Sequence, residues 1–437
     1  MQAADIRGLH RRIWAYLRNR KGGGTVRSKK NPELSDTQKA ICDLLASHLF
    51  GRETSVGAET DWRAVLEESY LQGVHMIVGQ VAARNGAPSE ILAEYKRSMI
   101  ARMIRDSHVH GSHTALHGVM MKHGLRYTVI KGVASSNYYP DPSLRSMGDV
   151  DFLVRAEEEK AILEVLQSEG YEVLERDRDH HAILQKKQIR LEMHIEPAGM
   201  PEGKTRPIIE GYLENILYAA VERKGPPAAC VCPSDFHHGL IILMHTQHHL
   251  LSEGIGLRHL CDWAAFVGHF EGEGFADLFR EELKRVGLWQ LARLLSVTCT
   301  LYLGLPEKAW MEIAKGDRDT AKELICDVFS GGNFGVKDPQ RAYEGMFISN
   351  RGKEGVKRNR LKEGFTSLNR ITYQLWPVTR KAPILLPIGW IVSIGHFVKR
   401  NRERKKRGGE INAIKAYHHS SYRKDLYRKL SLYQPEK

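Results

Sequence analysis

The sequence VIKGVASSNYYPDPSLRSMGDVDFLV occupies residues 129–154 and holds the most informative pattern of this 437-residue chain. Asp149 and Asp151 stand two residues apart at the head of an apolar run. Because side chains alternate between the two faces of a strand, both carboxylates are expected to project from the same face. Val150 and Phe152 then face a core. Two convergent carboxylates are hard oxygen ligands of the kind that suits Mg²⁺.

A second part of the pattern lies upstream, where Lys131 and Gly132 follow the apolar run 127–130. A glycine lets the backbone approach phosphates closely, and a lysine supplies a point charge for them. An isolated Asp-x-Asp pair is most often a solvated face of a strand. The full order of strand, Lys-Gly, short helix, Arg145, Gly-Asp-x-Asp and strand instead favours phosphoryl or nucleotidyl transfer.

A third acidic candidate lies in the segment 189–196, which alternates between apolar and polar residues. Leu191 and Met193 fall on one face, whereas Glu192 and His194 fall on the other. This alternation is typical of a half-buried strand. Glu192 is therefore expected on the polar face of a strand.

At these residues the chain resembles the nucleotidyltransferase superfamily, the fold of polymerase beta and of antibiotic adenylyltransferases. It is more similar still to a bacterial family with the pattern Lys-Gly … Tyr … Arg-x-Met-Gly-Asp-x-Asp-x-Leu-Val, whose members often accompany exopolysaccharide or modified-peptide gene clusters. The resemblance covers roughly residues 125–197 and extends more weakly over both flanks. It implies an α/β (α+β) nucleotidyltransferase core with a small mixed sheet, flanked by N- and C-terminal helical regions.

The resemblance also implies catalytic roles. Asp149 and Asp151 match the pair of metal carboxylates, and Glu192 is identified as the third, because the similar bacterial family has an acidic residue two before a histidine here. Gly132 matches the glycine that opens a helix toward the phosphates. Val133 departs from the broader superfamily, which prefers serine at this position.

The implied reaction is transfer of a nucleoside monophosphate from an NTP, such as ATP, to an acceptor hydroxyl, with Mg²⁺ or Mn²⁺ as cofactor. The acceptor stays open among a sugar, a lipid-linked saccharide, a small metabolite, a peptide and an RNA end. The expected nucleotide contacts are Lys131, Gly132, Arg145, Gly148 and Arg258. The alternative is a non-catalytic nucleotide-binding scaffold or sensor, which Val133 favours and the three carboxylates oppose.

Histidines suggest a third interpretation. His245 and His248 fall on one side of a helix expected over 236–251, and His259 and Asp262 follow. A transition-metal hydrolase site built on His245, His248 and Asp262 is one interpretation. Packing or hydrogen bonding of these residues beside the nucleotide cleft is favoured over it. The five histidines on the long helix expected over 89–124 could bind metal, but a solvated or packed helix face is favoured for them.

The composition indicates the general class of the protein and its cellular compartment. A hydrophobic share of 42% is ordinary for a globular protein of two or three domains. The six scattered cysteines fit buried or free thiols in a reducing compartment better than a zinc site. We expect no secretory signal and no transmembrane helix, and hence a cytoplasmic protein.

The net charge of +13 is unevenly distributed, because basic residues concentrate after Val336 while the preceding residues carry a slight acidic excess. The apolar segment 384–398 contains Trp390 and is followed by a dense basic cluster at 399–407. This combination is typical of an interfacial helix on an anionic membrane, which would place the protein at the inner membrane face. A core helix with a charged end is an equally weighted interpretation, and an RNA-binding tail is less favoured.

The expected organisation has five parts. They are a basic N-terminal segment and linker (1–34), an N-terminal helical region (35–124), the nucleotidyltransferase core (125–200), a helical domain packing on the cleft (201–330) and a basic C-terminal region (331–437). The glycine-rich segment 330–335 is interpreted as a domain-boundary turn rather than a phosphate loop.

Overall fold

The computed structural model describes residues 33–341, apart from 55, 58, 177–180, 202 and 339, together with parts of 368–395 and residues 422–431. The expected N-terminal basic segment therefore lies almost wholly outside the described residues. The apolar segment 384–398 is described only as far as residue 395, and the basic cluster at 399–407 is not described.

Among the described residues four α-helices precede the sheet, and the last of them is the longest. They are α2 (Asp36–Phe50), α3 (Trp62–Gln72), α4 (His75–Ala82) and α5 (Ser89–Lys122). The Ser35 hydroxyl accepts from the Gln38 N–H in a capping box at the start of α2, and the helix ends at the left-handed Gly51. The helical spacing of apolar residues runs through 61–83, but Gly73 (φ 75°) ends α3 and separates it from α4.

The core is a five-stranded mixed sheet with the order β1-β2-β5-β4-β3. Its elements are β1 (Thr128–Val129), α6 (Val133–Ser136), β2 (Val150–Leu153), α7 (Glu159–Ser168), β3 (Glu172–Arg176), β4 (His181–Lys186) and β5 (Ile189–His194). Strands β2 and β5 are parallel, and the other pairs are antiparallel. The expected small mixed sheet is confirmed, and β4 and β5 form a hairpin.

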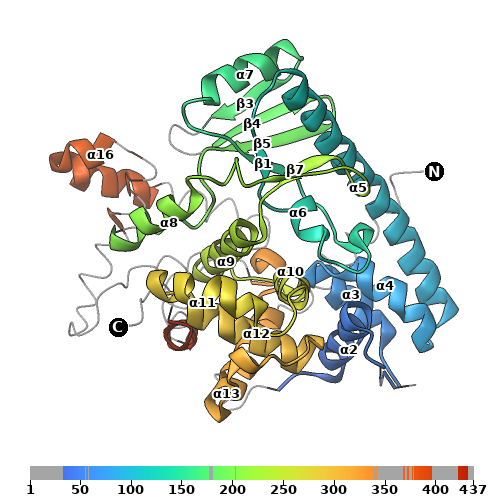
Figure 1. The fold of residues 1–437 in the computed structure, drawn as a ribbon. Coiled ribbons are helices and arrows are strands. Elements are labelled where there is room, and N and C mark those ends of the chain that lie inside the picture. Colours follow the sequence, from blue (N-terminus) through green and yellow to red (C-terminus); the bar gives the residue numbers. More distant parts are fainter. Residues whose placement is uncertain are drawn as a thin grey trace.

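The two faces of the sheet have different surroundings. Phe152 and Met193 lie on the face covered by α5 and α7, where they join one hydrophobic cluster with Leu116 and Leu166. The opposite face carries the polar side chains of β2 and β5. That face is turned toward the helical region beneath the sheet (Figure 1).

The second helical region follows the sheet. Its elements are α8 (Arg206–Leu213), β6 (Val221–Arg223), β7 (Cys230–Cys232), α9 (Asp235–Leu251), α10 (Leu257–Gly268), α11 (Gly274–Val286), α12 (Trp289–Leu303), α13 (Lys315–Gly331) and η6 (Asn333–Gly335). The β6–β7 pair was missed, because the whole of 208–330 was predicted to be helical. Three-residue strands are too short to show a period of two.

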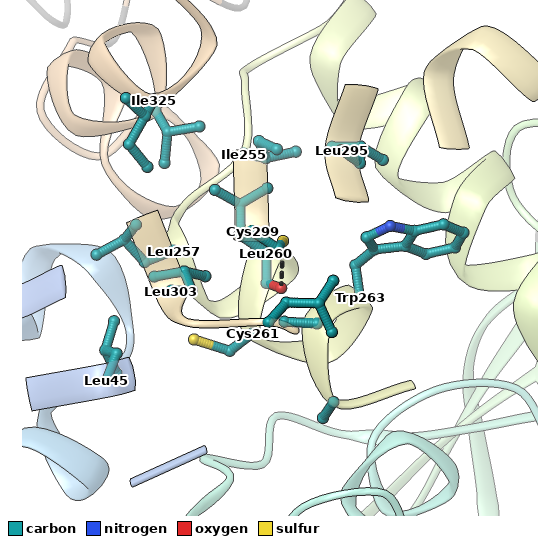
Figure 2. Close-up of a cluster of buried hydrophobic side chains, with 14 of the residues drawn as sticks. Leu45, Ile255, Leu257, Leu260, Cys261, Trp263, Leu295, Cys299, Leu303 and Ile325 are labelled. Carbon is teal, nitrogen blue, oxygen red and sulfur yellow. Dashed lines mark hydrogen bonds between the residues drawn. The ribbon is translucent and has the colours of Figure 1, made fainter. Parts of the chain in front are cut away.

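A large apolar cluster joins this region to the N-terminal helices. The cluster includes Leu45 of α2, Leu257 and Trp263 of α10, Leu295 of α12 and Ile325 of α13, and all five are fully or almost fully buried (Figure 2). Since α10 is at the centre of this cluster, its position is fixed by burial from several sides. Helix α10 therefore provides a rigid support for the polar residues near its first turn.

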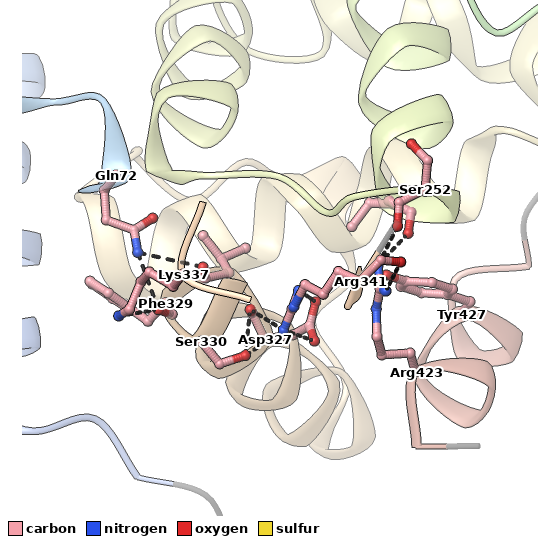
Figure 3. Close-up of polar contacts among 11 residues, drawn as sticks. Gln72, Ser252, Asp327, Phe329, Ser330, Lys337, Arg341, Arg423 and Tyr427 are labelled. Carbon is pink, nitrogen blue, oxygen red and sulfur yellow. Dashed lines mark hydrogen bonds and ion pairs between the residues drawn. The ribbon is translucent and has the colours of Figure 1, made fainter. Parts of the chain in front are cut away.

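The chain after α13 is attached to the helical region by buried polar contacts (Figure 3). Arg341 forms two hydrogen bonds to the Asp327 carboxylate, of 3.0 and 2.9 Å. Arg423, on the helical segment 422–429, donates to the carbonyls of Leu250 and Ser252 at the end of α9. These contacts hold the C-terminal end of α9 and the loop that follows it.

Further along the chain lie α16 (Val378–Lys381), η7 (Pro383–Leu385) and a helical stretch over 386–395. No helix among the described residues is long and apolar enough to cross a membrane.

Candidate active site

Three carboxylates converge at the start of β2. The parallel register pairs Asp151 with Glu192 on adjacent strands, so both side chains emerge from the same face of the sheet. Asp149 directly precedes β2, and its carboxylate is close enough to Glu192 to interact with it by both charge and hydrogen bonding. The sequence predicted all three acidic residues for this site, and the sheet brings them together.

Asp151 is the most deeply held of the three, with 6% of its side chain exposed. Its Oδ1 accepts from Lys131 Nζ at 2.8 Å and lies 3.0 Å from His194 Nε2. Burial opposes ionisation of this carboxyl. The Lys131 charge and the His194 hydrogen bond together outweigh burial, so the pKa of Asp151 is lowered. Asp151 is therefore an anion at neutral pH.

The pKa of Glu192 is shifted in the opposite direction. Burial raises the pKa of Glu192, and the neighbouring charges of Asp149 and Asp151 raise it further. Like charges this close repel each other, and a bound cation would relieve the repulsion. Asp151 is thus fixed in its charged form, whereas the charge of Glu192 depends on its surroundings.

Glu192→Gln is expected to stabilise the protein at pH 7 to 8 in the presence of EDTA. The folded-state pKa of Glu192 is raised, so the ionised group costs stability above that pKa, and the cost is lost as pH falls through it. The advantage of the variant should therefore shrink as the pH is lowered toward 4.5, the ordinary glutamate value. Chemical denaturation across this range measures it, with the exposed Glu175→Gln on β3 as control. Parallel pH profiles for wild type and Glu192→Gln would contradict the interpretation.

Gly132 occupies a backbone conformation that other residues rarely adopt, with φ 58° and ψ −110°. It precedes the expected short helix, α6, which ends at Ser136. A helix of four residues has too few aligned peptide groups to act as a macrodipole. The glycine is thus required for the sharp backbone turn between Lys131 and α6.

Gly132→Ala is expected to cost about 1–2 kcal/mol of unfolding free energy, because a Cβ strains this left-handed turn. The nearest described atoms to such a Cβ are 3.9 Å away, so backbone strain rather than a clash is the cause. Denaturant unfolding measures the loss. The matched control is Gly111→Ala in α5, where a helical alanine should be neutral or stabilising by about 0.5–1 kcal/mol. Equal effects at the two positions would show that the Gly132 conformation carries no strain.

Arg145 lies in a buried ion pair rather than at the carboxylates. Its Nε and Nη2 donate to the two oxygens of Asp262 in α10, at 2.8 and 2.7 Å. The Tyr139 hydroxyl donates to the same carboxylate at 2.7 Å, and the Met147 N–H donates to Asp106 of α5 at 3.1 Å. The loop that leads to Asp149 is therefore held by α5 and α10 together.

The other expected nucleotide contacts differ in their surroundings. Gly148 is exposed, and no described atom lies within 4 Å of the place of its missing Cβ. The Arg258 guanidinium lies over the Phe334 ring, 5.2 Å from its centre. Burial and the nearby Arg145 charge lower the pKa of Arg258 to about 10, which leaves it a cation at neutral pH. A phosphate contact of Gly148 or Arg258 stays a prediction.

Two histidines of the site were not among the predicted site residues. His194 was placed on the correct face of its strand, but its bond to Asp151 was not predicted. His113 of α5 is buried, and its Nε2 lies 3.9 Å from where a Cβ of Gly132 would be. The spacing of four residues between His113 and His117 indicated a shared helix face, but no local pattern showed that this face meets the Gly132 turn.

The donor set fits a hard divalent cation. Asp151, Glu192 and His194 each place one ligand atom within 4.8 Å of the others, and Asp149 adjoins them. Carboxylate oxygens are the ligands that Mg²⁺ and Mn²⁺ prefer. Arg190 pairs with Glu192 at 3.2 Å, yet burial and the charges of Asp149 and Asp151 still raise the pKa of Glu192.

A mixed sheet with flanking helices and acidic residues at the start of a central strand is the architecture of a nucleotidyltransferase core. A family model described as an uncharacterised nucleotidyltransferase matches residues 58–304. The match covers more than half of the chain, so the chain belongs to this nucleotidyltransferase family. No curated protein matches it.

Proposed function

We propose that this chain is a metal-dependent nucleotidyltransferase that moves an NMP from an NTP to an acceptor hydroxyl. The observation that carries the proposal is the convergence of Asp149, Asp151 and Glu192 beside Lys131. Mg²⁺ or Mn²⁺ held by the three carboxylates would neutralise charge on the triphosphate and act as a Lewis acid. Family membership supports the general reaction class.

In the proposed reaction the acceptor oxygen attacks the α-phosphorus, and the bond from this phosphorus to the bridging oxygen of the β-phosphate breaks. Pyrophosphate leaves with that electron pair. The acceptor hydroxyl proton passes to the Glu192 carboxylate where Glu192 acts as the base instead of completing the metal site. Asp151 is the weaker base of the two, because Lys131 and His194 lower its pKa.

Cationic and backbone groups around the carboxylates would bind the phosphates. Lys131 is 24% exposed, so its ammonium is accessible while it pairs with Asp151. The Gly132 turn and the exposed Gly148 would let phosphate oxygens approach the backbone. Arg258 is proposed as a further cationic contact, whereas Arg145 would act by positioning the loop through Asp262.

The acceptor is not identified by these residues. The resemblance to proteins of exopolysaccharide and modified-peptide clusters makes a saccharide or peptide hydroxyl the first class to test. The alternative of a nucleotide-binding scaffold or sensor predicts NTP binding without turnover. The discriminating experiment measures Mg²⁺-dependent pyrophosphate release from each NTP in the presence of cell extract. Release that requires the carboxylates supports the enzyme, and saturable NTP binding without release across acceptors supports the scaffold.

We also propose that the C-terminal region contacts an anionic membrane surface from the cytoplasmic side. Ile384 is 87% exposed, Ile391 is 73% exposed and Ile388 is 52% exposed, so apolar side chains of this segment face solvent. The sequence continues into the basic cluster at 399–407. Apolar side chains beside dense positive charge suit an interface with anionic lipids better than RNA.

Replacement of Ile388 and Ile391 by serine is therefore expected to weaken binding to vesicles by several-fold, since each isoleucine buries apolar area at the lipid boundary. Co-sedimentation with phosphatidylcholine vesicles containing phosphatidylglycerol measures it, and pure phosphatidylcholine vesicles are the control. Equal binding to both vesicle types, or binding of RNA in preference to either, would contradict the proposal.

A further inference from the structure

Three histidines of the helical region converge outside the carboxylate group. His245 and His249 lie one turn apart on α9, and His259 comes from the first turn of α10. Each offers one ring nitrogen, and these three nitrogens lie within 4.8 Å of one another. This group differs from the predicted one, since His249 and His259 take the places expected for His248 and Asp262. Asp262 instead pairs with Arg145.

We propose that His245, His249 and His259 bind a first-row transition metal ion, with Zn²⁺ the preferred occupant. Neutral imidazoles suit zinc, and a set of three leaves its fourth coordination position open. Zn–N bonds of about 2.0–2.1 Å in tetrahedral geometry place the ligand nitrogens about 3.3 Å apart. The Nε2 atoms of His245 and His249 are 3.0 Å apart. The inference does not rest on the proposed nucleotidyl transfer.

The environment of the cluster favours the neutral form of His245 and of His259. Burial lowers the pKa of His245, and the Lys131 charge lowers it further. Burial also lowers the pKa of His259, together with the Arg258 charge. Neutral rings keep the lone pair that a metal ion needs.

One ligand has the outer partner that metal-bound histidines commonly have. The Nδ1 atom of His249 lies 3.4 Å from Glu253 Oε2, and the Ser252 hydroxyl donates to the same oxygen at 2.6 Å. A carboxylate at Nδ1 favours the tautomer whose Nε2 carries the lone pair. The nitrogen that faces His245 is this Nε2. Glu253 thus orients His249 toward the centre of the cluster.

The glycine-rich segment after α13 closes one side of the cluster. Phe334 packs its ring 4.7 Å from His249 and 5.1 Å from His259, measured between ring centres. It does so with φ 54°, a value that residues other than glycine rarely adopt. The adjacent Gly335 allows close approach to the Glu253 carbonyl. The segment interpreted as a boundary turn thereby forms an apolar wall against the histidines.

One contact competes with the metal. The Gly256 N–H points at Nδ1 of His259 from 3.4 Å, near the outer limit of a hydrogen bond. Metal binding through Nε2 would put the proton on Nδ1 and break this long contact. Without a metal, the Nε2 atoms of His245 and His249 would share one hydrogen bond. The metal-bound cluster and the hydrogen-bonded cluster differ in zinc content, so elemental analysis distinguishes them.

The test uses the untagged full-length protein. After dialysis against buffer with trace Zn²⁺, elemental analysis should find about one zinc per chain, and titration with Co²⁺ should give the visible absorption of a tetrahedral nitrogen site. His249→Ala should abolish both, whereas His248→Ala, on the same helix, should retain both. Circular dichroism and thermal melting verify that each variant is folded.

A milder variant covers the case in which His249→Ala does not fold. Glu253→Gln keeps all three imidazoles and should weaken Zn²⁺ binding by about 10- to 100-fold. Asp149→Asn/Asp151→Asn should leave the Co²⁺ absorption of the histidine site unchanged. Three outcomes would overturn the proposal: no saturable binding of Zn²⁺ or Co²⁺ by folded wild type, undiminished binding in folded His249→Ala, or loss only in the aspartate double variant.

Discussion

Asp151→Asn should lower the rate of nucleotidyl transfer by at least about 10³-fold while leaving the fold intact. The substitution removes the charge nearest Lys131 and one of the three carboxylates proposed to hold the metal. Loss of about 4 kcal/mol of transition-state stabilisation corresponds to such a factor, and metal ions supply several kcal/mol of charge stabilisation. The asparagine has nearly the same shape, so the sheet should tolerate it. Initial rates of pyrophosphate release measure the effect.

The matched control is Asp277→Asn on the exposed surface of α11, which should retain the wild-type rate. Asp149→Asn is expected to behave like Asp151→Asn, because both carboxylates belong to the same group. Wild-type turnover by either folded variant would remove these carboxylates from the reaction.

Arg145→Met should destabilise the protein by about 3–5 kcal/mol, the usual cost of leaving one partner of a buried ion pair uncompensated. Arg145 is 7% exposed and Asp262 is 12% exposed, and two hydrogen bonds join them. Removal of the guanidinium leaves the Asp262 carboxylate buried, while the Tyr139 hydroxyl continues to donate to it. Denaturant unfolding at pH 7 measures the loss.

A second variant tests whether the loss of stability comes from the broken Arg145–Asp262 ion pair. Arg145→Met/Asp262→Leu removes both charges and should recover much of the stability, since apolar pairs of similar volume often replace buried ion pairs without cost. An exposed pair serves as control, and Lys160→Ala, opposite Glu164, should change stability by less than about 0.5 kcal/mol. If Arg145→Met proves as stable as wild type, the ion pair does not hold the loop.

Local patterns were sufficient to predict the strand faces on which the carboxylates lie. The alternation of apolar and polar residues in 189–195 predicted the strand face from which Glu192 projects. The Asp-x-Asp spacing predicted that Asp149 and Asp151 project from one face of their strand. Both arguments need only the period of a strand, which neighbouring residues determine. The period alone does not bring Glu192 beside the two aspartates, and that association was expected only from the family resemblance.

Long-range contacts were beyond such reasoning. Arg145 meets Asp262 across 117 positions, so its position in the sequence beside the Gly-Asp-x-Asp pattern suggested a phosphate contact and gave no sign of the ion pair. For the histidines, a spacing of three drew attention to His248. The helix instead turns His245 and His249, which are four apart, toward α10. The side on which α10 packs is decided by the burial of its apolar face in the shared core, which no local window contains.

The most direct test of nucleotidyl transfer is a comparison of two labels in one acceptor assay. Purified protein, Mg²⁺ and cell extract are incubated with an NTP labelled either at the α-phosphate or at the γ-phosphate. Attack at the α-phosphorus predicts that only the α-label moves to an acceptor, that the γ-label appears in pyrophosphate, and that Asp149→Asn/Asp151→Asn does neither. Transfer of the γ-label to the acceptor, or α-label transfer that survives in the double variant, would contradict the account.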